Sequence, residues 1–207
     1  MKANAFTEDS YDGFVVERVR DTSVEARYIE KITYQETVTD PFGNEEIFDR
    51  VSYRQVDFNL FEDFPNIELW DAPRSFQAYV SKLLELSSFS LSISPLRVNL
   101  LDWAVAFQAE LRKQVTIDSM QIAGLELETG VSAKVLVTGD KDVRIALDHF
   151  VKGRRYVVEK LQLKAKFDSK LAPIHLTNHG SAKIPEDVLE YLLPLLRNSL
   201  PNSVSGG

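Results

Sequence analysis

The sequence predicts an α+β protein with largely antiparallel sheets, three to four helices, a long N-terminal β-hairpin and a Leu-rich C-terminal helix. Three observations support this prediction. Two long segments rich in β-branched and aromatic residues flank a turn-forming segment, 40–44. Several other segments repeat apolar residues at helical spacing. The turns between the strands are too short for parallel crossovers, so neighbouring strands are expected to run antiparallel.

The N-terminal third is expected to form strands. A short strand is predicted at 14–19, and the hairpin is predicted from strands at 26–38 and 46–60. The turn between them contains a Pro, which fixes φ, and Gly and Asn, which accept positive φ. On the second hairpin strand the apolar residues change face part-way along. This change predicts a bulge, or burial of different faces at the two ends.

The middle of the chain alternates between helix and strand patterns. A helix is predicted from about 71 to 84, followed by a half-buried strand at 88–93 that Pro95 ends. A second helix is predicted at 100–113, where apolar residues form one stripe. Asn99 is a favourable N-cap for this helix, because its side chain can accept a hydrogen bond from the first turn.

The last third returns to strands and ends in a helix. Strands are predicted at 115–122 and 131–137, and a helix is predicted from an N-cap at Asp140 to a stop at Gly153. The segment 154–167 has the cleanest two-faced strand pattern. One of its faces carries Val157, Leu161, Leu163, Ala165 and Phe167, and the other carries Lys160, Gln162, Lys164 and Lys166. An extended segment is expected at 172–176.

The closing Leu-rich helix begins near Pro185 and is expected to kink at Pro194. It is either buried in its own fold, which we favour, or shared with a second chain. We expect residues 1–200 to form a single α+β domain, with a two-lobed organisation, 1–95 and 96–200, as the alternative. The segment 201–207 lacks core-forming residues and is expected to be a disordered tail.

The composition excludes several classes of protein. The chain has 207 residues, no cysteine and a net charge of −7, from 24 Lys and Arg against 31 Asp and Glu. Without cysteine there can be no disulfide scaffold, no Cys-ligated metal and no thiol nucleophile, and a cytoplasmic location is expected. The longest apolar runs have four or five residues. No membrane insertion is expected, because a spanning helix needs about 20 such residues.

The charge is distributed unevenly along the chain. Residues 1–71 carry −10, residues 72–151 carry −1 and residues 152–207 carry +4. The oppositely charged regions either neutralise each other within the fold or bind partners of opposite charge, including a second copy of the same chain.

The basic residues of 152–170 are the candidate surface for a polyanion or a protein partner. The lysines could contact successive phosphates of a nucleic-acid backbone, and the ring of Tyr156 offers a surface on which a base could stack. Against nucleic acid stand the lack of interleaved aromatic residues and the overall charge of −7. The alternative is that these lysines bind no partner and only keep an exposed strand solvated. The candidate residues are Lys152, Arg154, Arg155, Tyr156, Lys160, Lys164 and Lys166.

Catalytic signals are weak. Glu126 and Glu128 project from one face of a strand, with Asp118 upstream, and such carboxylates can bind Mg²⁺ or transfer protons. Solvent-facing positions of an ordinary strand give the same pattern. His175 and His179 lie in a segment expected to be extended, which separates their rings by roughly 13 Å. The nucleophile, phosphate-loop and zinc-helix motifs are missing, so no cofactor or metal site is predicted.

The sequence therefore favours a non-enzymatic interaction or adaptor subunit of a larger cytoplasmic assembly. It would bind protein partners, or a second copy, through an acidic N-terminal region and a basic C-terminal region. The first alternative is a nucleic-acid-binding accessory protein that uses the strand in 152–170. The second alternative is a metal-dependent hydrolase or nuclease.

Overall fold

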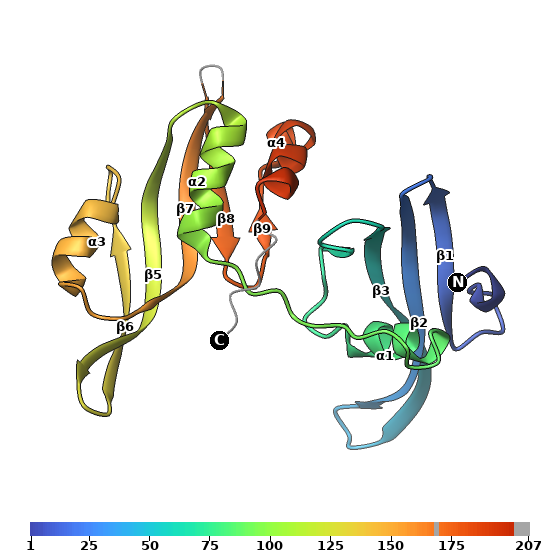
Figure 1. The fold of residues 1–207 in the computed structure, drawn as a ribbon. Helices are drawn as coiled ribbons and strands as arrows, with labels where there is room; N and C mark the ends of the chain where they lie inside the picture. The colour runs from blue at the N-terminus through green and yellow to red at the C-terminus, as the bar shows by residue number, and fades with distance from the viewer. Residues whose placement is uncertain (168–169, 201–207) are drawn as a thin grey trace. The chain divides into compact units, whose positions relative to one another are not determined.

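The computed structural model describes residues 1–167 and 170–200, and these form two compact units that divide between Ser94 and Pro95 (Figure 1). Each unit contains one antiparallel sheet, of four strands in the first and five in the second, together with helices. The predicted α+β class, the long hairpin and the C-terminal helix are confirmed. The tail predicted at 201–207 lies outside the described residues.

The N-terminal unit is a four-stranded antiparallel sheet with one α-helix. Its strands lie in the order β1-β2-β3-β4, so each strand pairs with its neighbour in sequence. The short 3₁₀ helix η1 precedes them, and α1 follows. The elements are η1 (Lys2–Asn4), β1 (Asp12–Val19), β2 (Ser23–Thr39), β3 (Glu45–Phe61), β4 (Ile67–Trp70) and α1 (Gln77–Leu86).

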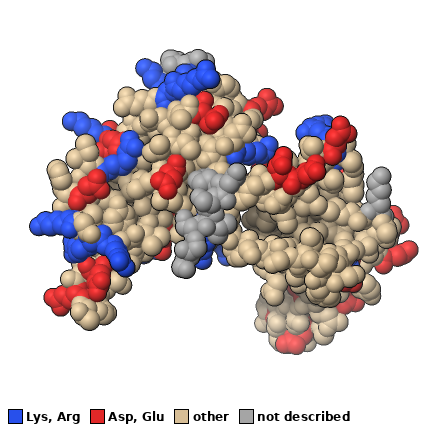
Figure 2. All heavy atoms as spheres, in the orientation of Figure 1, with Lys and Arg blue, Asp and Glu red and all other residues tan. Residues whose placement is uncertain are grey.

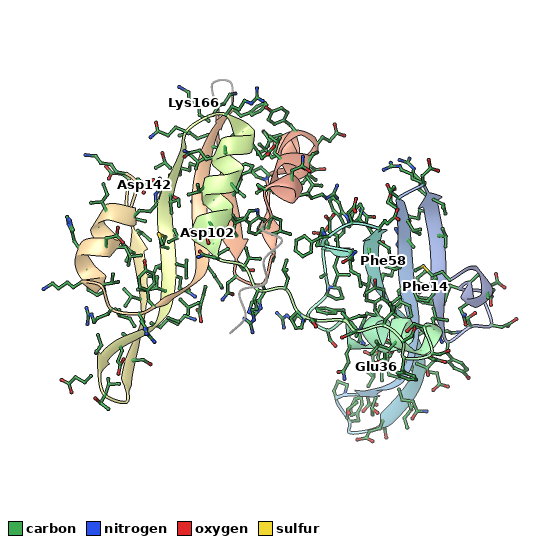
Figure 3. All side chains as sticks on the ribbon, in the orientation of Figure 1. Phe14, Glu36, Phe58, Asp102, Asp142 and Lys166 are labelled. Atoms are coloured by element: carbon green, nitrogen blue, oxygen red, sulfur yellow. The ribbon has the colours of Figure 1, made fainter. Side chains whose placement is uncertain are left out.

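Aromatic side chains form the core of this unit. Phe14, Tyr28 and Phe58 project from neighbouring strands toward Tyr79 of α1, and each is at most 3% exposed. The ring centroids of Phe58 and Tyr79 lie 4.7 Å apart. Figure 3 shows Phe14 and Phe58 inside the unit. Alternate residues of β1–β3 thus bury one face of the sheet under the helix.

The β2–β3 hairpin is longer than predicted and has an unbroken register. The two strands pair from Ser23↔Phe61 to Thr39↔Glu45 without a shift, so the first of the two predicted alternatives, a bulge in this pair, is wrong. Val56 is 1% exposed, whereas Val51, on the other face, is 53% exposed. The apolar residues change face because the core covers one face at the base of the hairpin and does not reach its far end.

The strand predicted at 88–93 is also wrong. Residues 87–99 contain neither helix nor strand, and Ser88 and Phe89 have φ values of 51° and 58°. The hydroxyl of Ser87 donates to the carbonyl oxygen of Leu84, and the hydroxyl of Ser90 donates to that of Ser87. Serine side chains that hydrogen-bond the local backbone favour a turn over strand pairing. The segment therefore forms no strand, although its apolar and polar residues alternate as in one.

The C-terminal unit is a five-stranded antiparallel sheet in the order β6-β5-β7-β8-β9. Figure 1 shows α2 lying in front of this sheet. The strands are β5 (Val115–Glu128), β6 (Val131–Thr138), β7 (Val157–Phe167), β8 (Lys170–Thr177) and β9 (Ala182–Lys183), and the helices are α2 (Leu100–Leu111), α3 (Arg144–Val151) and α4 (Glu186–Asn198).

The helices bury one face of this sheet. Ile117, Leu163 and Ile174, from three adjacent strands, are fully buried. The indole N–H of Trp103 in α2 donates to the carbonyl oxygen of Leu196 in α4, at 3.1 Å. The Leu-rich helix therefore packs within its own unit through its buried residues, which are Val188, Leu192 and Leu196.

Two local predictions in this unit need correction. On β7, Val158 is buried and Val157 is 57% exposed, because the register with β5 shifts there and places a bulge at Glu159. The third helix begins at Arg144 rather than near Asp140. Its N-cap is Val143, and the carboxylate of the preceding residue, Asp142, accepts the backbone N–H of Arg144.

Candidate interaction surfaces

The far part of the β2–β3 hairpin projects beyond the strands that flank it. We call residues 31–53 the arm. β1 pairs with β2 only over 24–30, and β4 pairs with β3 only over 57–60. Within the described part of the chain, no other strand pairs with the arm. At its base, the backbone N–H of Lys31 donates to the carbonyl oxygen of Tyr11, and the ring of Phe6 packs on that of Tyr53.

The arm exposes large apolar side chains on both of its faces. The register places Tyr34 and Phe48 on one face and Ile47 and Val51 on the other. Phe42, in the turn, is 90% exposed. This concentration of exposed apolar residues makes the arm a candidate interaction surface. The seven side chains, which are 39–90% exposed, are Tyr34, Val38, Phe42, Ile47, Phe48, Val51 and Tyr53.

The arm also carries a negative charge at its tip. Glu45 and Glu46 are exposed next to the turn, whereas Glu36, farther from it, forms an ion pair of 2.7 Å with Arg50 (Figure 3). Asp40 organises the turn. Hydrogen bonds from the side chain and backbone of Asn44, and from other turn N–H groups, hold the pKa of Asp40 below its usual value. The arm has five acidic and two basic residues in all.

The candidate basic residues divide between a loop and a strand. Four lie in or next to the connection from α3 to β7, where Arg154 has a structural role: its guanidinium donates to the carbonyl oxygens of Phe150 and Val151 at the end of α3. Tyr156 is half-buried, and burial together with Asp148 raises its pKa. The loop residues are Lys152, Arg154, Arg155 and Tyr156, and the strand residues are Lys160, Lys164 and Lys166.

The lysines of β7 lie on the sheet face away from the buried residues. We call this the open face. It is centred on Lys160, Gln162, Lys164 and Lys166 of β7, and the register places Thr116 and Gln121 of β5 and His175 of β8 beside them. Its residues are exposed or half-exposed, with Asp118 as the buried exception. The predicted division of β7 into an apolar and a basic face thus holds at these positions.

Asp118 compensates one of these lysines. It lies where the β5–β7 register shifts, and only 7% of it is exposed. One carboxylate oxygen, Oδ2, accepts from Lys164 Nζ at 2.7 Å and from Gln162 Nε2 at 3.2 Å. The other, Oδ1, is buried without a hydrogen-bond partner. Asp118 therefore acts within the sheet and is far along β5 from Glu126 and Glu128.

Glu126 and Glu128 line a shallow hollow with basic residues. The hollow, of about 450 Å³, is formed by the end of β5 and by the loop that contains Arg154 and Arg155. In Figure 2 red side chains gather at the end of the β5–β6 hairpin, with blue ones beside them. Within residues 1–167 and 170–200, no group of three or more His, Asp or Glu side chains is arranged to hold a metal ion.

No protein-family model matches the chain, and no curated protein matches it significantly. No helix in the described part of the chain is long and apolar enough to cross a membrane.

Sequence reasoning did not identify the arm as a surface. The change of face along the hairpin predicts only a bulge, or burial of different faces at its two ends. The length of the strands was the available signal. Strands of 17 residues are about three times the usual length, so part of such a hairpin is expected to extend beyond its sheet.

Proposed function

We propose that the protein is a non-enzymatic adaptor subunit of a larger cytoplasmic assembly and that it binds a protein partner through the arm. The observation that supports this is the exposure of seven large apolar side chains on an element with no core of its own. A fold gains nothing from extending such residues into water, whereas a partner that covers them gains their full transfer free energy.

The exposed apolar side chains of the arm supply a large part of the free energy that binding requires. Full burial of one large apolar side chain contributes about 1.5–3 kcal/mol. Seven side chains, each roughly half-exposed, therefore offer on the order of 5–10 kcal/mol. This falls within the cost of association, about 4–15 kcal/mol, so additional polar contacts are required. Because both faces are apolar, a partner that encloses the arm gains more than a flat one.

The charge of the arm defines the chemistry of that partner. The acidic residues exceed the basic ones by three in the arm and by nine in residues 1–94. A partner surface that combines lysine or arginine with apolar side chains is therefore expected, and association should weaken with salt.

The two alternatives receive less support. Nucleic-acid binding by the strand in 152–170 is disfavoured because two of its cationic side chains are already engaged. Lys164 forms an ion pair with Asp118, and the guanidinium of Arg154 is hydrogen-bonded to the end of α3. For a metal-dependent hydrolase, Glu126 and Glu128 share their hollow with Arg154 and Arg155, and the positive charge of these arginines disfavours a metal cation there.

Position-specific photo-crosslinking tests the adaptor function in cells. A photoreactive phenylalanine analogue replaces Phe42 in the arm or, as a matched control, Tyr11, which lies outside the arm and is 80% exposed. We expect one discrete adduct from position 42 and none from position 11. The adduct should disappear when Ile47→Ser removes an apolar contact. Lack of an arm-specific adduct, or one that survives Ile47→Ser, contradicts the proposed function.

A further inference from the structure

The open face has an excess of positive charge that its own unit does not compensate. Lys164 is paired with Asp118, and Lys134 of β6 is paired with Glu159. Lys160, Lys166 and Lys183 remain, with no salt bridge to any residue of the described segments. Lys183 pairs across β8–β9 with His175, which places it on the same face.

Apolar side chains accompany these lysines. Leu136 of β6 is 63% exposed and Leu171 of β8 is 62% exposed. They stand opposite Gln121 and Lys166 respectively, so they belong to the open face. The face therefore offers ammonium groups together with apolar contacts, which is the combination that the arm requires of its partner.

The same face is poorly suited to single-stranded nucleic acid. The register positions that form it on β5, β7 and β8 carry no Phe, Tyr or Trp on which a base could stack. The acidic excess of the whole chain also opposes a polyanion. An acidic polypeptide satisfies both conditions, because it needs neither stacking nor a strongly positive protein.

The chain itself supplies such a polypeptide. At the tip of the arm, Glu45 and Glu46 lie next to the exposed side chains of Phe42 and Ile47. Resting on the proposed function, we infer that the partner is a second copy of this chain and that the arm of one copy docks on the open face of the next. The carboxylates of Glu45 and Glu46 then meet the ammonium groups of Lys160 and Lys166, and Phe42 and Ile47 meet the exposed leucines.

Charge reversal in purified full-length protein tests this inference. The first variant carries Lys160→Glu and Lys166→Glu, and the second carries Glu45→Lys and Glu46→Lys. Sedimentation velocity at low and high salt is expected to show reversible association of the wild type that weakens with salt. Each variant alone should lose this association by more than about tenfold in Kd, since like charges then face each other. Two matched controls, Lys141→Glu and Glu8→Lys with Asp9→Lys, alter exposed residues elsewhere and should associate like the wild type.

Mixing the two variants distinguishes docking of the arm on the open face from other modes of association. The intact arm of the first variant complements the intact open face of the second, and the reversed arm of the second complements the reversed face of the first. An equimolar mixture should therefore associate where each variant alone does not. A chain carrying all four reversals should regain association, because the charges are exchanged on both sides. Loss of association in only one of the two variants, or a mixture that stays monomeric, overturns the inference.

Two further results overturn the inference without affecting the proposed function. One is a wild type that is monomeric at every concentration while the arm forms its specific adduct with a different protein in cells. The other is a labelled RNA that binds the wild type and not the Lys160→Glu, Lys166→Glu variant, which assigns the open face to nucleic acid.

Discussion

Asp118 and Lys164 form an ion pair in the C-terminal unit, and we expect replacement of the lysine to cost more stability than replacement of the aspartate. The side chain of Asp118 is 9% exposed, whereas that of Lys164 is 36% exposed. Removing the lysine by Lys164→Met leaves a buried carboxylate with one remaining donor, Gln162. Removing the charge of the aspartate by Asp118→Asn leaves a lysine that can turn into water.

The magnitudes follow from this difference in burial. Leaving one member of a fully buried pair alone costs about 3–5 kcal/mol. Because Lys164 is partly exposed, solvent screens the interaction, and we expect Lys164→Met to lower the free energy of unfolding by about 2 kcal/mol. Asp118→Asn should lower it by less than about 1 kcal/mol, since the amide still accepts a hydrogen bond. The double variant should cost less than the sum.

Urea unfolding combined with hydrogen exchange of peptides from β5 and β7 measures both effects. The exchange data report on the C-terminal unit, and peptides from β1–β3 serve as an internal reference that should not change. Equal losses for the two single variants, or a larger loss for Asp118→Asn, would refute the argument that burial of the carboxylate determines the cost.

Three further predictions concern local structure. Asp142→Ala should lower the free energy of unfolding by about 1–2 kcal/mol, because the carboxylate accepts from the backbone and guanidinium of Arg144. Burial alone would raise the pKa of Asp142, but these hydrogen bonds lower it. The contribution of Asp142 to the free energy of unfolding should therefore be present above about pH 4 and be lost as the pH falls further. Thermal melting of the wild type and the variant at pH 7 and pH 3 would show this loss. The depressed pKa of Asp40 predicts that the turn of the arm also loosens only in acid, which faster amide exchange in the turn would reveal; unchanged exchange in an Asp40→Ala variant would contradict this. Gly13→Ala should detach the N-terminal segment, because the added Cβ would lie 2.7 Å from the Cα of Phe6, and limited proteolysis would detect the release.

Elements determined by nearby residues were predictable from the sequence. The side chain of Asn99 accepts the backbone N–H groups of Leu101 and Asp102, as expected of an N-cap. The turn at 40–44 closes the hairpin, with Gly43 at a φ of 88°. In both cases the stabilising contacts lie within four residues, so the local pattern contains the necessary information.

Features determined by distant residues were not predictable. The bulge at Glu159 changes the face on which Val157 lies, and it arises from the pairing of β7 with β5. The compensation of Lys164 by Asp118 joins two strands that are far apart in sequence. The exposure of the arm follows from the short length of β1 and β4, since alternation shows which side chains share a face but not whether another element covers that face.

The projection of the arm beyond its neighbouring strands also has a consequence for aggregation. In the described chain, both long edges of the arm lack a neighbouring strand. Beyond Lys31, whose N–H donates to Tyr11, the outward N–H and C=O groups of these edges can template a foreign β-strand. Charged residues punctuate these edges, with Glu36 on one strand and Asp49 and Arg50 on the other. Such gatekeepers oppose uncontrolled stacking of strands while leaving the apolar side chains accessible. The acidic residues of the arm would then protect newly made copies from amyloid-like assembly before any partner has arrived.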